Sequence, residues 1–222
     1  MQSPKMEADL IIKNANIYTV DDDFSIASVI AIKNGDIISV GGDEILNDYV
    51  STKLINAEGN FIYPGFNDGH SHFLGYGVSL IKYADLIGTT SFEEVIERVK
   101  KHNDEFPSQW ILGRGWDQND WEFKDFPDNN LLNELFPDQA VVLIRIDGHA
   151  VLANDFALKI IGYDENTKIE GGELLKKNGK LTGVLVDAAA YKMKNAIPAL
   201  TKLEKELALI KAQENCFAKG LT

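Results

Sequence analysis

The residues with the clearest chemical potential are His70 and His72, one residue apart in the stretch PGFNDGHSHF at positions 64–73. They are two of only four histidines in the chain. In an extended segment, side chains at i and i+2 point to the same side, so the two imidazoles would form a bidentate platform for a metal ion. Asp68 could accept an imidazole N–H as an outer partner. The alternative is that both histidines are ordinary polar residues at the start of a loop.

A second group of polar residues follows the ends of two apolar runs. Asp147 and His149 come just after QAVVLIRI, where His149 either faces a substrate or hydrogen-bonds a turn. Trp116 and Asp117 end WILGRGWD, and they would give an aromatic wall and an acceptor at a catalytic rim, or a packed indole and a helix cap. Arg114 would pair with an anionic substrate group or brace an acidic loop. We therefore take Asp117 and His149 as candidate catalytic residues, and Arg114 and Trp116 as candidate substrate-binding residues.

The first part of the chain is predicted to be built of strands. Residues 9–63 contain short apolar runs separated by turns. Asn34-Gly35 is a strong hairpin signal because both residues tolerate a positive φ. A second hairpin is expected around Glu58-Gly59. These patterns predict a small antiparallel β-module.

After Gly75 the pattern becomes helical and alternates with strands. Apolar runs at 110–117, 139–147 and 183–187 are predicted strands, and the second is typical of a strand covered on both faces. Asn154 is expected to cap a short helix. This alternation predicts βα units with parallel strand pairing.

Two longer helices are marked by capping boxes. Ser91 with Glu94, and Thr201 with Glu204, have the spacing in which each side chain bonds the other residue's backbone. The apolar residues of the second helix follow one stripe, formed by Leu203, Leu207, Ile210 and Phe217. Cys216 lies beside this stripe and is expected to be a buried small hydrophobe.

PGFNDGHSH, placed after a β-module that opens with ADLIIKNANIYTVD, resembles the entry motif of the amidohydrolase superfamily. That motif runs proline, glycine, a bulky apolar residue, then aspartate and HxH. The stretches WILGRGWDQNDW, RIDGHAVLANDFAL and GGELLKKNGKLTGVLVDAA narrow the resemblance to the amidohydrolase-3 branch, which includes N-substituted formamide deformylases and YtcJ-like enzymes. The resemblance extends from about Asp9 to the last residue.

The resemblance implies an α/β fold, in which residues 64–222 are the opening βα units of a TIM-type (β/α) barrel and residues 1–63 are a β-sandwich segment. It also implies metal-dependent hydrolysis of a non-peptide carbon–nitrogen bond. A water activated by one or two divalent ions, usually zinc, would attack a carbonyl. His70 and His72 match the first ligand pair. Asp187 follows GVLV where relatives commonly carry glutamate, and it is the candidate for a further metal ligand although its side chain is one methylene shorter.

The later histidine ligands of such enzymes have no counterpart here. His102 falls on the polar face of a predicted helix, and a complete barrel of this type needs about 250 residues or more. The sequence is therefore expected to be an N-terminal portion with an incomplete site. The alternative is a non-catalytic regulatory or interaction protein that uses a degenerate amidohydrolase scaffold. An interrupted barrel would expose a parallel edge, so self-association through that edge is also expected.

Composition limits the other classes of function. A net charge of −12 over 222 residues argues against nucleic acid as a partner, because counterion release needs a basic surface. No apolar run approaches the roughly 18–20 residues that cross a bilayer, and the opening MQSPKMEADL lacks the features of a secretory leader. With Cys216 as the single cysteine, a cytoplasmic location is expected.

Overall fold

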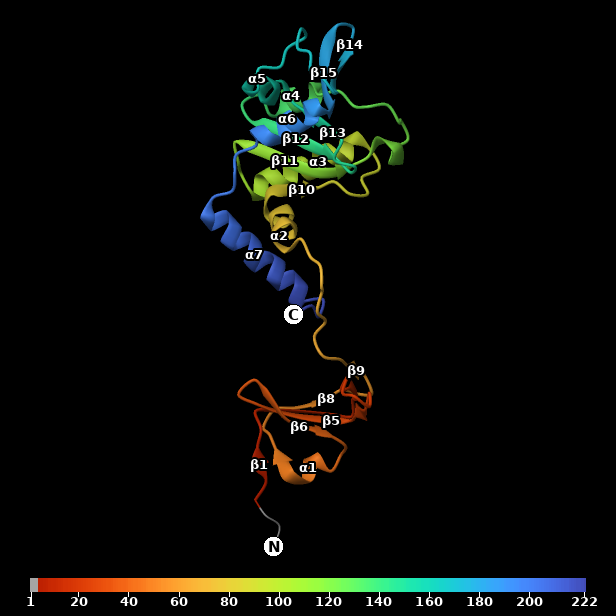
Figure 1. Ribbon diagram of the computed structural model, residues 1–222, viewed down its shortest axis with the longest axis vertical. Helices are drawn as coiled ribbons and strands as arrows, with labels where there is room; N and C mark the ends of the chain where they lie inside the picture. The colour runs from red at the N-terminus through yellow and green to blue at the C-terminus, as the bar shows by residue number, and fades with distance from the viewer. Residues whose placement is uncertain (1–3) are drawn as a thin grey trace. The chain divides into compact units, whose positions relative to one another are not determined.

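The computed structural model describes residues 4–222, which divide into two units (Figure 1). The first unit comprises residues up to Asp68 together with Gly220–Thr222, and the second comprises Gly69–Lys219. The division lies beyond the boundary expected at residue 63 because Phe66 still pairs within the first unit, with Leu221.

The first unit is built from short strands. Its central sheet has the order β6-β5-β2-β8, a second sheet has the order β4-β3-β9, and β1 pairs with β7. The elements are β1 (Met6–Glu7), β2 (Leu10–Lys13), β3 (Asn16–Tyr18), β4 (Ile26–Ala27), β5 (Val29–Lys33), β6 (Asp36–Gly41), α1 (Ile45–Asp48), β7 (Tyr49–Val50), β8 (Leu54–Asn56) and β9 (Phe61–Ile62). The predicted hairpin at Asn34-Gly35 is confirmed: φ is 53° and 85° at the two residues, and β5 and β6 pair antiparallel.

The predicted second hairpin is wrong. Glu58 and Gly59 do form a turn with positive φ at both residues, but the strands that it joins do not pair with each other. Instead β8 pairs in parallel with β2, and β9 pairs in parallel with β3. The ladder continues through the turn, where the Gly59 amide donates to the Asn14 carbonyl oxygen at 2.7 Å. The β-module is therefore mixed and not purely antiparallel.

The last residues of the chain return to the first unit. Phe66 and Leu221 form a parallel bridge, with Phe66 N donating to Gly220 O at 2.7 Å and Thr222 N donating to Phe66 O at 2.9 Å. Gly220 has φ of 79°, in the turn that follows α7. The second unit therefore lies, in sequence, between the two segments that form this parallel bridge.

The second unit contains one six-stranded sheet, with the order β10-β11-β12-β13-β15-β14. Its elements are α2 (Phe73–Lys82), β10 (Tyr83–Asp85), α3 (Phe92–Glu105), β11 (Trp110–Trp116), the 3-10 turn η1 (Gln118–Asp120), α4 (Asn130–Leu135), β12 (Ala140–Arg145), β13 (Ala150–Ala153), α5 (Asp155–Ile160), β14 (Gly172–Lys177), β15 (Lys180–Asp187), α6 (Ala188–Ala196) and α7 (Lys202–Phe217). Of the three strands predicted in this unit, β11 and β12 pair in parallel as expected, whereas β15 pairs antiparallel with β13 and β14. The sequence did not predict β10, β13 or β14; β10 pairs in parallel with β11, and β13 pairs antiparallel with β12. A short turn of 146–149 reverses the chain after β12, whereas a parallel neighbour needs a longer crossover.

Apolar residues cover both faces of this sheet. On one face Val141 and Leu143 pack with α3 and α4, and on the other Val142 and Val151 pack with α5 and α6. Residues 140–144 are all buried, as the continuous apolar run predicts. The second unit is therefore a three-layer α/β/α arrangement (Figure 1).

The predicted helix caps are largely confirmed. Thr201 and Glu204 form a complete capping box, while Ser91 accepts from the Glu94 amide but the Glu94 carboxylate bonds Thr90 instead. Asn154 accepts from the Ala157 amide and caps α5.

Helices α2 and α7 pack against each other through small residues. Ala208 and Ala212 are the buried residues of α7, whereas the predicted apolar stripe is exposed and Cys216 is only half-buried. A Cβ added to Gly77 of α2 would lie 2.0 Å from the Ala208 carbonyl oxygen, so close approach of the two backbones decides which face of α7 is buried.

An ion pair fixes the other end of this helix contact. Lys82 Nζ lies 2.5 Å from Glu204 Oε1, and the Glu204 carboxylate also accepts from Thr201. The hydrogen bonds from Lys82 and Thr201 lower the pKa of Glu204 to about 2. The carboxylate is therefore charged throughout the neutral range.

None of the helices in residues 4–222 combines the length and apolar character required to cross a bilayer.

Gly77→Ala is expected to lower the free energy of unfolding of the second unit by roughly 1–3 kcal/mol, because the added methyl group forces α2 and α7 apart. Gly75→Ala is the matched control: its Cβ would meet nothing closer than His72 Cβ at 3.9 Å, so the substitution should be neutral or slightly stabilising. Chemical denaturation followed by circular dichroism measures both. Equal stability of the two variants would contradict the packing described.

Candidate functional site

His70 and His72 lie in irregular chain between Gly69 and α2, not in a regular strand. Their ring centroids are 5.4 Å apart with the planes at 90°, and both residues are exposed. The predicted proximity of the two imidazoles is therefore present. The backbone at His72 (φ −92°, ψ 54°) is not extended, so strand alternation does not produce this proximity.

The two rings fit part of a metal-binding set. Neutral imidazole nitrogen is a common ligand of zinc and other transition metals. Within residues 4–222, however, no group of three or more His, Cys, Asp and Glu side chains could hold a metal ion. A stable metal centre at this pair would need additional donors.

The second group of candidate residues gathers at one edge of the six-stranded sheet. Strands β10, β11 and β12 are parallel, and β15 runs in the same direction because it is antiparallel to β13. Their carboxyl ends therefore meet at one edge, which we call the carboxyl edge. It carries Asp117, Arg145, Asp147, His149 and Asp187. In open α/β sheets, ligands bind outside the carboxyl ends of the strands.

Arg145 connects several residues of the carboxyl edge. Its guanidinium donates to Asp117 Oδ1 at 2.8 Å and to Gln118 Oε1 at 2.9 Å, and it also forms an ion pair with Asp147. Its side chain is 14% exposed, so the charge is largely removed from water and needs these acceptors. Arg145 was not among the residues selected from the sequence. A charged residue at the end of an otherwise apolar strand would have indicated a side chain that needs acceptors at the edge of the sheet.

The turn after β12 is held by the carboxylate of Asp147. Its Oδ1 accepts from the His149 amide at 2.9 Å. Burial opposes ionisation of Asp147, but the His149 amide and the Arg145 charge outweigh it and lower the pKa of this carboxyl. Lys194 of α6 donates to the Gly148 carbonyl oxygen at 2.8 Å. The backbone of residues 147–149 is therefore fixed from several directions.

His149 and Asp187 form a side-chain pair at the surface. Nδ1 of His149 lies 2.9 Å from Oδ1 of Asp187, and the Asp187 amide donates to the His149 carbonyl oxygen at 2.8 Å. Asp187 was expected to ligate a metal ion, and that role stays a prediction. In this structure its carboxylate is engaged by His149.

The other predicted residues have structural partners. Trp116 is 1% exposed, and its Nε1 donates to the Leu143 carbonyl oxygen. Asp117 caps η1 through the Asn119 amide in addition to pairing with Arg145. These contacts match the packed indole and the helix cap raised as alternatives. Arg114 is exposed and makes no ion pair among the described residues, and its charge opposes the rise in pKa that burial gives Tyr83. A role in substrate binding for Arg114 and Trp116 stays a prediction.

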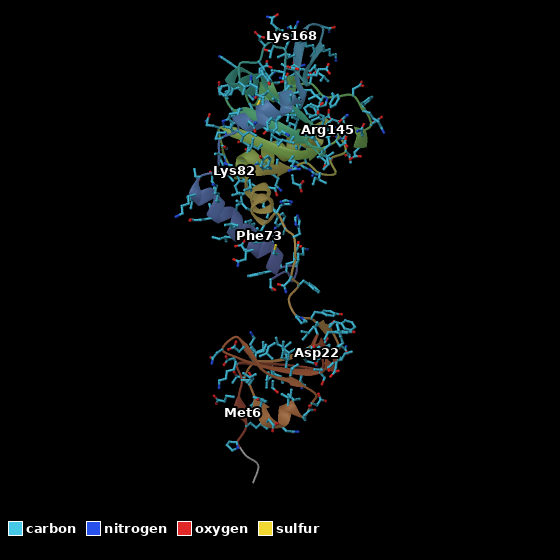
Figure 2. The ribbon with its side chains drawn as sticks, viewed as in Figure 1. Met6, Asp22, Phe73, Lys82, Arg145 and Lys168 are labelled. Carbon is cyan, nitrogen blue, oxygen red and sulfur yellow. The ribbon has the colours of Figure 1, made fainter. Side chains whose placement is uncertain are left out.

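The structure does not bring the histidine pair to the carboxyl edge. His72 precedes α2, and α2 leads directly into the amino end of β10. The carboxyl edge lies beyond the other end of that strand. Figure 2 shows Phe73, next to His72, well separated from Arg145.

Arg145→Met is expected to lower the free energy of unfolding by about 2–3 kcal/mol, because Asp117 and Asp147 lose the charged donor that compensates their partial burial. Arg114→Met removes an exposed arginine from the neighbouring strand and should change stability by less than about 0.5 kcal/mol. Denaturant titration of both variants measures the difference. Equal effects would contradict the central role given to Arg145.

Comparison with known proteins gives consistent matches. The model of a family described as the amidohydrolase family matches residues 53–222. The YtcJ protein of Bacillus subtilis (strain 168) is 34% identical over 93% of this chain and 40% of its own length. The N-substituted formamide deformylase of Arthrobacter pascens is 30% identical over 85% of this chain and 36% of its own length.

A solved structure agrees with these relatives. An uncharacterized metal-dependent hydrolase from Pyrococcus horikoshii superposes with a TM-score of 0.65 at 26% identity, covering 96% of this chain and 41% of that one. The chain thus spans about two fifths of the length of the proteins that it matches. Because the family model covers most of the sequence and the fold agrees, the chain belongs to the amidohydrolase family.

Proposed function

We propose that this chain is part of a metal-dependent amidohydrolase that cleaves a non-peptide carbon–nitrogen bond. The observation that carries the proposal is the pair of exposed imidazoles, 5.4 Å apart, within the motif PGFNDGHSH. The relative named as an N-substituted formamide deformylase supports the bond type, and the Pyrococcus relative supports dependence on a metal ion.

His70 and His72 are the proposed metal ligands. When bound, a divalent ion, for which zinc is the expected identity, supplies the Lewis acid for attack of water on a carbonyl. His70 and His72 would hold that ion through ring nitrogens. Asp187 lies at the carboxyl edge, which the histidine pair does not reach, so it is a candidate ligand for a second ion.

We also propose that the segment around Phe66 and the segment around Leu221 are neighbouring strands of a TIM-type barrel, with α7 as the helix between them. Their parallel bridge supports this assignment, because consecutive strands of such a barrel are parallel and adjacent. Residues 1–63 would then be the β-sandwich segment that accompanies the barrel, and Gly69–Leu200 would be an insertion.

Metal binding tests the proposal directly. Calorimetric titration of the chain with Zn²⁺ should show weak binding, because only two protein ligands are present, and excess Zn²⁺ should raise the melting temperature, because an ion that binds only the folded state stabilises it. The His70→Ala/His72→Ala variant should lose both effects. His102→Gln is the matched control, since His102 lies on α3 away from the pair, and it should bind as wild type does. Unchanged binding in the double variant would contradict the assignment.

The second candidate function is a non-catalytic interaction protein built on the amidohydrolase scaffold, which associates with copies of itself. Its support is the exposed apolar stripe of α7, formed by Leu203, Leu207, Ile210 and Phe217. Leu207 and Ile210 also line a groove of about 560 Å³ between α7 and α3. Exposed apolar surface of this kind favours association.

Self-association predicts a defined oligomer in solution scattering. Leu207→Glu/Ile210→Glu should shift the chain toward the monomer because it places charge on the stripe. Lys202→Glu/Lys205→Glu, on exposed positions of the same helix, is the control and should leave the oligomer intact. A monodisperse wild-type monomer would contradict this proposal.

A further inference from the structure

The pair formed by His149 and Asp187 has a defined donor and acceptor. An ionised carboxylate only accepts hydrogen bonds, so the contact of 2.9 Å between Nδ1 and Oδ1 requires the proton on Nδ1. In a neutral imidazole the other nitrogen, Nε2, then carries the lone pair. The His149 side chain is 72% exposed, and no hydrogen bond to Nε2 is found among residues 4–222.

We propose that Asp187 is a positioning residue that fixes His149 with its proton on Nδ1, so that Nε2 accepts a hydrogen bond from an N–H group of a substrate at the carboxyl edge. The N–H part of this inference rests on the proposed cleavage of carbon–nitrogen bonds. The positioning part stands on the geometry of the pair alone.

The backbone of Asp187 supports the positioning role. Its φ of 51° and ψ of −117° lie in a region that residues other than glycine rarely adopt, so surrounding contacts must hold the conformation. Those contacts are the bond from the Asp187 amide to the His149 carbonyl oxygen and the bond from the Ala188 amide to the Gly171 carbonyl oxygen. The conformation directs the carboxylate to Nδ1 of His149 instead of capping α6, for which no side-chain bond forms.

The main chain of His149 is held independently of its ring. The Asp147 carboxylate accepts a hydrogen bond from the His149 amide and forms an ion pair with Arg145. Lys194 donates a hydrogen bond to the adjacent Gly148 carbonyl oxygen. The ring is thus placed by Asp187 on a turn that is already fixed. This division allows the side-chain contact to be removed without loss of the turn.

The charges at the carboxyl edge indicate the class of ligand. Asp117, Asp147 and Asp187 are opposed by Arg145 and Lys194, which leaves a net negative charge. Both this negative charge and the lone pair of Nε2 would repel an anionic group. A neutral amide with an N–H is the favoured partner, because it donates to Nε2 and carries no negative charge.

The tautomer of His149 tests the positioning role without any assay of hydrolysis. Long-range ¹H–¹⁵N spectra of the full chain labelled at histidine nitrogens, recorded at a pH where the imidazole is neutral, distinguish protonated from unprotonated ring nitrogens. The signals of His149 are assigned by their loss in His149→Gln. In the wild type, Nδ1 should appear protonated and Nε2 unprotonated.

Asp187→Gly is the decisive variant, because glycine adopts the backbone conformation of Asp187 without strain and removes the side chain that carries the carboxylate. The proton should shift toward Nε2 in this variant. Glu173→Gln, an exposed carboxylate on neighbouring β14, is the control and should leave the tautomer unchanged. A proton on Nε2 in the wild type, or an identical tautomer in Asp187→Gly, would overturn the positioning role.

Titration with N-methylacetamide and, separately, with acetate tests the acceptor role. The amide should move the Nε2 resonance of His149 more than acetate does, and Asp187→Gly should reduce the difference. An equal or larger response to acetate would overturn the acceptor role. Because neither measurement involves metal, their outcome is independent of whether His70 and His72 bind zinc.

Discussion

The carboxyl edge of the six-stranded sheet depends on the placement of one partly buried guanidinium group. Arg145 ends an entirely apolar strand, where a positive charge is costly unless acceptors surround it. Asp117 and Gln118 from the end of β11, and Asp147 from the following turn, provide those acceptors. One charge therefore links the ends of two strands and sets the backbone that carries His149. His149, which is exposed to a ligand, is thus positioned indirectly, through the Asp147 carboxylate that pairs with Arg145.

Local signals in the sequence predicted local structure well. Asn34-Gly35 formed its hairpin, Thr201 and Glu204 formed a complete capping box, and residues 140–144 were buried on both faces. Each of these depends on neighbours within a few residues, for which spacing carries enough information. The proximity of His70 and His72 was of the same kind, since two residues so close in sequence remain close in any conformation.

Features that depend on distant partners could not be predicted in this way. The antiparallel direction in which β13 pairs with β12 is set by the short connection between them and not by the composition of the strands. The apolar stripe predicted on α7 is exposed, because the close approach of Gly77 to Ala208 buries the face with small residues instead. Likewise, Glu58-Gly59 has the residues of a hairpin turn, but β2 and β3 were already available as parallel neighbours for the strands that it joins. The placement of Asp187 beside His149 required the whole sheet.

The bridge between Phe66 and Leu221 has a consequence for how the molecule acquires its structure. More than 150 residues separate these two neighbours, and closing so long a flexible loop directly would be slow and entropically unfavourable. The contact between α2 and α7 lies near both ends of that loop, so prior folding of the intervening unit shortens the effective distance that must be closed. During synthesis on the ribosome, residues 69–219 emerge before Leu221, so the six-stranded sheet can form before Phe66 meets its partner. A substitution that slows folding of this unit would then delay formation of the Phe66–Leu221 bridge without changing either residue.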